Sequence, residues 1–142
     1  MKIYIAAPLF SSAEKEQNKR ITKILEDCGH EVFLPQRDGG CFAELPSYID
    51  GISREKFLHQ KDIQALNWCD AILFVFDGRV PDEGACFELG YAYAKGKRCF
   101  GFKTDTRSLV QGYDNLMIVV SIETISHSEE ELESFFKLGP GG

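Results

Sequence analysis

Short apolar segments recur along the chain and predict β-strands. They are KIYIAA at 2–7, HEVFL at 30–34, DAILFVF at 70–76 and the segment at 97–102 that contains RCFGF. The segment at 70–76 is almost continuously apolar, which is typical of a strand that is covered on both faces. We therefore expect at least four strands, one of them central.

The segments between these strands have apolar residues at helical spacing, which predicts helices. Residues 12–28 place apolar side chains at Ile21, Ile24 and Leu25, and Gly29 follows as a helix-ending residue. Residues 53–68, the stretch PDEGACFELGYAYAKG from 81 and the closing SEEELESFFK are further predicted helices. The chain between PQRDGG and about residue 52 reads as irregular. The apolar run LMIVVSI at 116–122 fits a strand or a helix equally well by periodicity.

Strands that alternate with helices predict a parallel sheet with helices on both faces. We expect an α/β fold, a single-domain, flavodoxin-like (Rossmann-like) three-layer sandwich over residues 1–142, with 138–142 as a flexible tail. Ligands of such sheets bind beyond the carboxyl ends of the strands, which here are the loops after residues 7, 34, 76 and 102. The sequence has no GxGxxG after the first strand and no GxxxxGK[ST], so side chains must supply the chemistry.

Composition narrows the class of ligand. The net charge is −6 and the pI is about 5.1, which disfavour a nucleic-acid polymer as partner. No apolar run approaches the ~20 residues that cross a bilayer, and the first apolar segment is too short for a signal peptide, so we expect a cytoplasmic protein with no membrane contact. The five cysteines show no CxxC and the three histidines are scattered, which predicts free thiols and neither metal nor cofactor.

One carboxylate in the helix from residue 81 stands among apolar residues. Glu88 is flanked by Phe87 and Leu89, with no basic residue three or four positions away. An ionised Glu is almost never buried without a partner. A structural ion pair is one explanation, and a functional carboxylate kept ionised by the positive end of the helix dipole is the other.

Two further acids are predicted near the same crevice. Asp62 lies four residues after Leu58 and four before Leu66, on the helix stripe that faces the protein, although solvent exposure or pairing with a neighbouring Lys or His is an equal alternative. Asp82 precedes a helix start, so an N-cap explains it as well as a ligand contact does. Two carboxyl groups that flank an anomeric carbon can perform glycosidic chemistry, one as nucleophile and the other as acid.

Four segments together resemble a known family. IYIAAPLF at the start, HQKDIQAL around Asp62, PDEGACFELGYA around Glu88 and DNLM at 114–117 are similar in order and spacing to the nucleoside 2-deoxyribosyltransferases. The resemblance spans about residues 2–118. It implies an enzyme of the glycosyltransferase (pentosyltransferase) class that acts on 2′-deoxynucleosides and free nucleobases.

The resemblance implies a role for each residue at the site. Glu88 would be the nucleophile at C1′, Tyr4 would orient it, and Asp62 would exchange the proton of the departing and incoming bases. Tyr4 as an ordinary strand aromatic is the alternative. Asp82 and Asn115 would hold the sugar hydroxyls, with Asn115 reaching a neighbouring subunit's site in a homo-oligomer, a dimer or hexamer.

Asp82 also distinguishes between related activities. In the similar deoxynucleoside 5′-monophosphate N-hydrolases, hydroxyl side chains at the positions of Asp82 and Asn115 receive a phosphate, which a carboxylate would repel. The sequence thus favours a free nucleoside. Two other functions stay open: an N-glycosidase that uses water as the acceptor, and a non-catalytic nucleoside-binding module.

Overall fold

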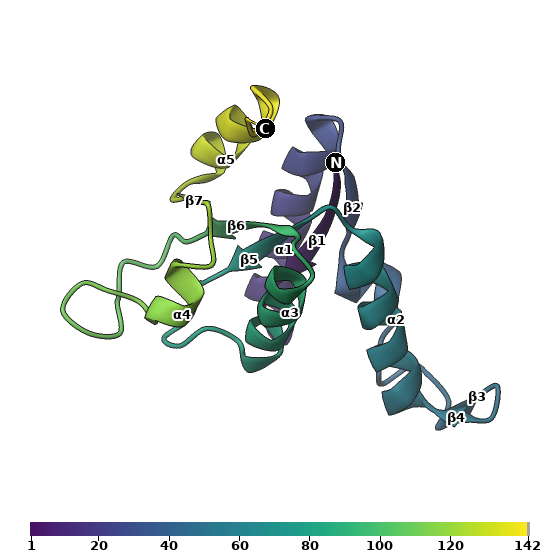
Figure 1. Cartoon of the computed structure of the whole chain (residues 1–142). Helices are drawn as coiled ribbons and strands as arrows, with labels where there is room; N and C mark the ends of the chain where they lie inside the picture. The colour runs from purple at the N-terminus through teal and green to yellow at the C-terminus, as the bar shows by residue number, and fades with distance from the viewer. Residues whose placement is uncertain (142) are drawn as a thin grey trace.

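A parallel five-stranded sheet forms the centre of the protein, whose computed structural model describes residues 1–141 (Figure 1). Its order is β2-β1-β5-β6-β7, the order of doubly wound flavodoxin-like sheets. The predicted α/β fold class is confirmed. The strands are β1 (Lys2–Ala6), β2 (Glu31–Phe33), β5 (Ala71–Val75), β6 (Arg98–Phe102) and β7 (Thr124–Ser126).

Helices cover both faces of this sheet. Helices α1 (Ser12–Asp27) and α5 (Glu129–Lys137) pack on one face, and α2 (Arg54–Trp68) and α3 (Glu83–Ala94) pack on the other. Side chains alternate along a strand, so β1 sends Ile3 and Ile5 into the first layer and Tyr4 and Ala6 into the second. This alternation aims Tyr4 at α3.

The fifth strand lies outside every strand predicted from the sequence. Residues 116–122, which fitted a strand or a helix, begin as the short helix α4 (Leu116–Val119), and β7 follows it at the sheet edge. Strand β7 is only three residues long and only its Ser126 is fully buried. It therefore carries no apolar run that a sequence pattern could detect.

The segment between β2 and α2 is more regular than expected. It contains the single π-helical turn η1 (Pro35–Gly39) and an antiparallel pair, β3 (Tyr48–Ile49) with β4 (Ile52–Ser53). Asp50 and Gly51 both have positive φ angles, +50° and +81°, which is the pattern of the two-residue type I′ turn. The β3–β4 hairpin projects from the N-terminal end of α2, away from the sheet (Figure 1).

The helix boundaries follow their capping residues. Serines cap α1, α2 and α5, and Asp82 caps α3. Gly29 has φ of +86° after the end of α1, as predicted for a helix-ending glycine. Among residues 1–141, no helix has the length and apolar character to cross a membrane. In the predicted tail 138–142, the Pro140 carbonyl accepts a hydrogen bond from Arg98 at 3.1 Å, and Gly142 lies outside the described residues.

Candidate active site

The partner of Glu88 is a phenol, not a cation. The Tyr4 hydroxyl donates a hydrogen bond of 2.9 Å to Glu88 Oε1, and the Tyr4 ring is fully buried. The ring of Phe33 on β2 stacks on Tyr4 with centroids 5.4 Å apart and planes 12° apart. Within residues 1–141, Glu88 forms no ion pair, which argues against the structural-pair interpretation.

Burial raises the pKa of Glu88, and the N-terminus of α3 lies more than one turn away. Burial raises the pKa of the Glu88 carboxyl to about 8, and the negative charges of Asp62 and Asp82 raise it further, while the Tyr4 hydrogen bond lowers it. The dipole acts within the first turn of a helix, whereas Glu88 lies in the second turn of α3, beyond the cap at Asp82. Burial and the two neighbouring carboxylates therefore act against the ionised state of Glu88, whereas the Tyr4 hydrogen bond favours it.

Asp62 lies on α2, half-buried, near the same carboxyl group. Burial raises the pKa of Asp62 to about 6, while the charges of His59 and Lys61 lower it. Lys61 directs its Nζ to the Asp38 carbonyl at 3.2 Å, and no ion pair of Asp62 is found within residues 1–141. The chain passes close to Asp62 at Gly39, where a Cβ would lie 3.5 Å from Asp62 Oδ1.

A cavity of about 770 Å³ opens in front of Asp62. Its walls come from the loop after β1, the N-terminal part of α1, the segment after β2 and one face of α2, and most of its exposed lining is apolar. The lining residues are Leu9, Phe10, Ser12, Lys15, Glu16, Lys19, Pro35, Gln36, Gly39, Gly40, Cys41, Phe42, Ala43, Leu58 and Asp62. The chain after PQRDGG, which reads as irregular in the sequence, thus supplies part of this wall through residues 41–43.

Asp82 and Asn115 line a second cavity, of about 910 Å³, and Phe10 lines both cavities. Both residues are helix caps. Asp82 Oδ2 accepts a hydrogen bond from the backbone of Ala85 at 2.8 Å, and Asn115 Oδ1 accepts one from Met117 at 3.0 Å. The N-cap interpretation of Asp82 is confirmed, but capping uses only one of its two carboxylate oxygens.

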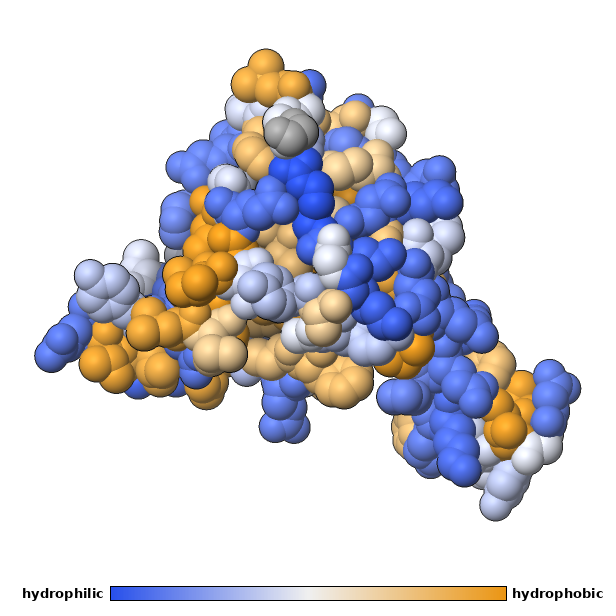
Figure 2. All heavy atoms as spheres, viewed as in Figure 1, coloured by the Kyte–Doolittle hydropathy of each residue, from blue (hydrophilic) through white to orange (hydrophobic). Residues whose placement is uncertain are grey.

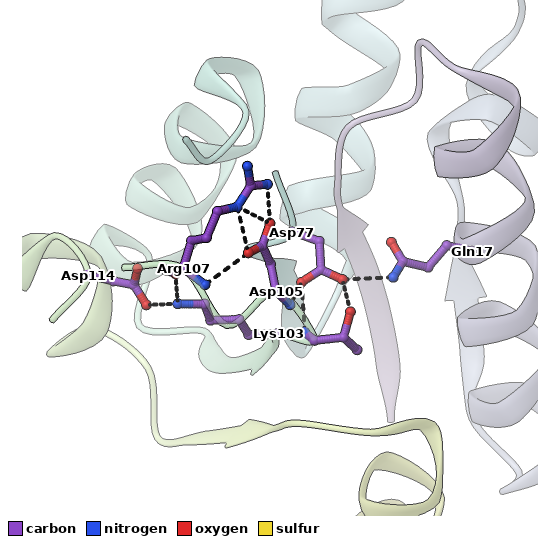
Figure 3. A network of polar contacts seen from close by, with 7 residues as sticks. Gln17, Asp77, Lys103, Asp105, Arg107 and Asp114 are labelled. Carbon is purple, nitrogen blue, oxygen red and sulfur yellow. Dashed lines mark hydrogen bonds and ion pairs between the residues drawn. The ribbon is translucent and has the colours of Figure 1, made fainter. Parts of the chain in front are cut away.

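Asp77 is not among the predicted site residues, yet it connects chain segments around these cavities (Figure 3). It follows β5, and its carboxylate accepts hydrogen bonds from the backbone and hydroxyl of Thr104, both at 2.7 Å, and from Gln17 Nε2 at 2.8 Å. Beside it, Lys103 pairs with Asp114 at 2.6 Å, next to Asn115. The signal for Asp77 was its place at the carboxyl end of the central strand, where parallel sheets gather functional loops.

A family model described as nucleoside 2-deoxyribosyltransferase matches residues 3–134. The chain belongs to this family. No curated protein matches it by sequence. Within residues 1–141 of this family member, no three His, Cys, Asp or Glu residues lie close enough together to hold a metal ion.

Solved structures agree with the family assignment. A conserved protein of Enterococcus faecalis V583 has a TM-score of 0.80 at 26% identity, with 97% of this chain and 98% of that one covered. A 2-deoxyribosyltransferase of Bacillus psychrosaccharolyticus has a TM-score of 0.77 at 27% identity, with 94% and 90% covered. A CMP N-glycosidase of Clostridium botulinum, at 19% identity and a TM-score of 0.58 over 94% and 96%, shares the fold.

The geometry of this deoxyribosyltransferase family member defines what the site can do. The hydroxyl of Tyr4 fixes one oxygen of a half-buried carboxyl group, and a second carboxyl, Asp62, lies near enough to raise the pKa of the first. Two interacting carboxyl groups of this kind share a single proton over a range of pH. One group can then act as a nucleophile while the other supplies the proton.

Proposed function

We propose that the protein is a nucleoside 2-deoxyribosyltransferase, a pentosyltransferase that exchanges the base of a 2′-deoxynucleoside through a covalent deoxyribosyl-Glu88 intermediate. The observation that carries this proposal is the carboxyl of Glu88, held by the Tyr4 hydroxyl at 2.9 Å beside Asp62. The family model and the B. psychrosaccharolyticus enzyme support it.

In the proposed reaction, a Glu88 carboxylate oxygen bonds to C1′ as the bond from C1′ to the base nitrogen breaks. The bonding electrons leave with the base, and Asp62 gives that nitrogen a proton. A second base reverses both steps, so it releases Glu88 and returns the proton to Asp62. With pKa values of about 8 and 6, the pair holds one proton near neutral pH, and the productive form carries it on Asp62.

The second cavity supports a free nucleoside as substrate. Asp82, Glu83 and Asp114 line it with one cation, Arg79, so the carboxylates outnumber the positive charge even though Asp114 pairs with Lys103. A phosphate dianion would be repelled by Asp82 and Glu83. Asp82 Oδ1 forms no hydrogen bond within residues 1–141 and can accept one from a sugar hydroxyl. A 2′-hydroxyl would withdraw electrons from the oxocarbenium-like transition state, which favours deoxynucleosides.

The test is chromatographic. Purified protein is incubated with 2′-deoxyinosine or thymidine, with and without adenine or cytosine, and free bases and new nucleosides are measured over time. The proposal expects base exchange that Glu88→Ala abolishes, with Glu31→Ala, an exposed glutamate on β2, as the control. Full exchange by Glu88→Ala would exclude the covalent role. Release of base at one rate with or without an acceptor would indicate an N-glycosidase, and binding without turnover would indicate a binding module.

We also propose that the enzyme assembles as a homo-oligomer in the cytoplasm. Apolar side chains gather over α4 and the loop before it (Figure 2), around Asn115, and an interface would cover them. These exposed residues are Leu109, Val110, Tyr113, Leu116, Met117 and Val120. Light scattering of the wild type and of Met117→Asp tests the assembly: a monomeric wild type would contradict it.

A further inference from the structure

The loop after η1 lines the cavity in front of Asp62, and Arg54 contacts this loop. Arg54 is the first residue of α2, eight positions before Asp62, and its guanidinium carbon lies 4.0 Å from the centroid of the Phe42 ring. That distance is well inside the range of a cation–π contact, and a guanidinium stacks on an aromatic face as a flat plate. One surface of the Phe42 ring is therefore covered by protein.

The same arginine also binds the loop backbone. Arg54 Nη1 donates to the carbonyl of Leu45 at 3.2 Å and to that of Phe42 at 3.4 Å, while its own backbone N–H donates to Ser47 at 3.0 Å. Gly40 opens the loop with φ of +109°, where a Cβ would touch Leu45 and Leu58. The loop is thus tied to α2, the helix that carries Asp62, through Arg54 at its second half, while Gly40 lies next to Leu58 of the same helix.

Phe42 stays accessible although Arg54 covers part of it. Phe42 is 48% exposed, and it lines the same cavity as Asp62. Contact between the exposed part of this aromatic ring and water is unfavourable. A flat apolar ligand that covered the ring would remove this contact and gain binding free energy. Stacking on an aromatic side chain suits any nucleobase, since every base has a π-face.

We propose that Phe42 is a base-stacking residue of the active site and that Arg54 is the positioning residue that holds its ring. The inference rests on the proposed function for the identity of the ligand, a planar uncharged nucleobase. Because Arg54 and Asp62 share one rigid helix, the ring that stacks on the base and the acid that protonates it keep a fixed separation. Recognition by stacking would accept both purines and pyrimidines.

Four variants test the pair. Phe42→Ala removes the ring, Arg54→Met removes the guanidinium but keeps a long side chain, and the double variant removes both; Phe42→Tyr restores an aromatic face. The matched controls are Tyr48→Ala, an exposed aromatic residue on the neighbouring β3, and Arg20→Met, whose exposed pair with Glu129 lies elsewhere. Arg54→Lys serves if Arg54→Met does not fold.

The readouts are KM and kcat for the acceptor base in the exchange assay and, independently of turnover, Kd for adenine and cytosine by calorimetry. Phe42→Ala is expected to raise both KM and Kd tenfold or more, the size of one lost base–aromatic stack, with kcat changed less than about threefold. Arg54→Met should raise KM and Kd about three- to fivefold. The double variant should raise them no more than Phe42→Ala alone does, and Phe42→Tyr should bind adenine and cytosine as the wild type does.

Each outcome separates this inference from the function on which it rests. If the wild type exchanges bases but Phe42→Ala keeps its KM and Kd, the stacking role is wrong and the function stands. If the wild type binds adenine without turnover and Phe42→Ala weakens that binding, the stacking role stands and the transferase is wrong. Additive effects of the two substitutions would overturn the role of Arg54, and a wild type that binds no base would overturn both roles.

Discussion

Glu88→Gln should make the protein more stable while it abolishes exchange. The buried Glu88 carboxyl has its pKa raised from 4.5 to about 8, so at neutral pH it keeps its proton in the folded chain and loses it on unfolding. A raised folded pKa gives stability that is fully present below the unfolded pKa and is lost as pH rises through the folded one. A glutamine keeps the shape, accepts the Tyr4 hydrogen bond and never ionises.

The magnitude follows from these two pKa values. Between pH 4.5 and pH 7 the carboxyl is ionised in the unfolded chain and protonated in the folded one. The free energy of unfolding therefore falls by about 1.4 kcal/mol per pH unit. The wild type should therefore be about 3 kcal/mol less stable than Glu88→Gln at pH 7, relative to their difference near pH 4.5. Above pH 8 the gap should stop widening, because the folded carboxyl then ionises as well.

Urea denaturation at a fixed protein concentration, from pH 4.5 to pH 9, measures this difference. A fixed concentration is needed because subunit association would add to the apparent stability. Glu31→Gln is the control, since its side chain is exposed on β2 and its substitution should not produce a gap that widens with pH. Parallel stability curves for the wild type and Glu88→Gln would refute the burial argument for this carboxyl.

Three further predictions concern the catalytic pair and the sheet. The pH dependence of kcat/KM should be bell-shaped, with limbs near pH 6 and pH 8, because only the form in which Asp62 and Glu88 share one proton is productive; a flat profile over this range would contradict it. Tyr4→Phe removes the hydrogen bond that lowers the Glu88 pKa. Exchange should therefore fall at least tenfold, and the alkaline limb of the profile should move to higher pH. A limb that stays in place would show that Tyr4 does not affect the Glu88 pKa. Gly101→Ala should destabilise the fold by about 1–3 kcal/mol in thermal or urea unfolding, because its Cβ would lie 2.9 Å from a phenylalanine ring carbon; Gly90→Ala, with nothing within 4 Å, is the control and should be neutral or stabilising.

The sheet and its helices could be predicted wherever burial leaves a long apolar pattern. The central strand β5 is buried at every position, and its apolar run showed this directly. Strand β7 could not be found, because an edge strand of three residues with a buried serine has no such pattern. The β3–β4 hairpin was missed although Asp50-Gly51 is a hairpin turn signal, since strands of two residues are too short for a periodicity.

The candidate site divides in the same way. The misplaced charges at Glu88 and Asp62 were visible in the sequence, because a carboxylate inside an apolar pattern needs an explanation. The partner of Glu88 was not visible from spacing, since Tyr4 is 84 positions away and only the parallel pairing of strands brings it to α3. The raised pKa of Glu88 was not predicted, because its burial depends on the packing of α3 on the sheet, which no local sequence pattern reports.

The buried carboxyl of Glu88 lowers the stability of the fold at neutral pH. The expected loss of about 3 kcal/mol at pH 7 is a large fraction of the free energy of unfolding of a typical domain. A glutamine would remove that cost, so the carboxyl is best explained by chemistry that an amide cannot perform. Polar contacts hold the loops around it: Asp77 joins α1 to the loop after β6, and Arg54 joins the loop after β2 to α2. The fold thus places a destabilising group on α3 against Tyr4 of β1 and fixes the surrounding walls with separate interactions. Substitutions in those walls should therefore alter substrate binding before they alter the catalytic pair.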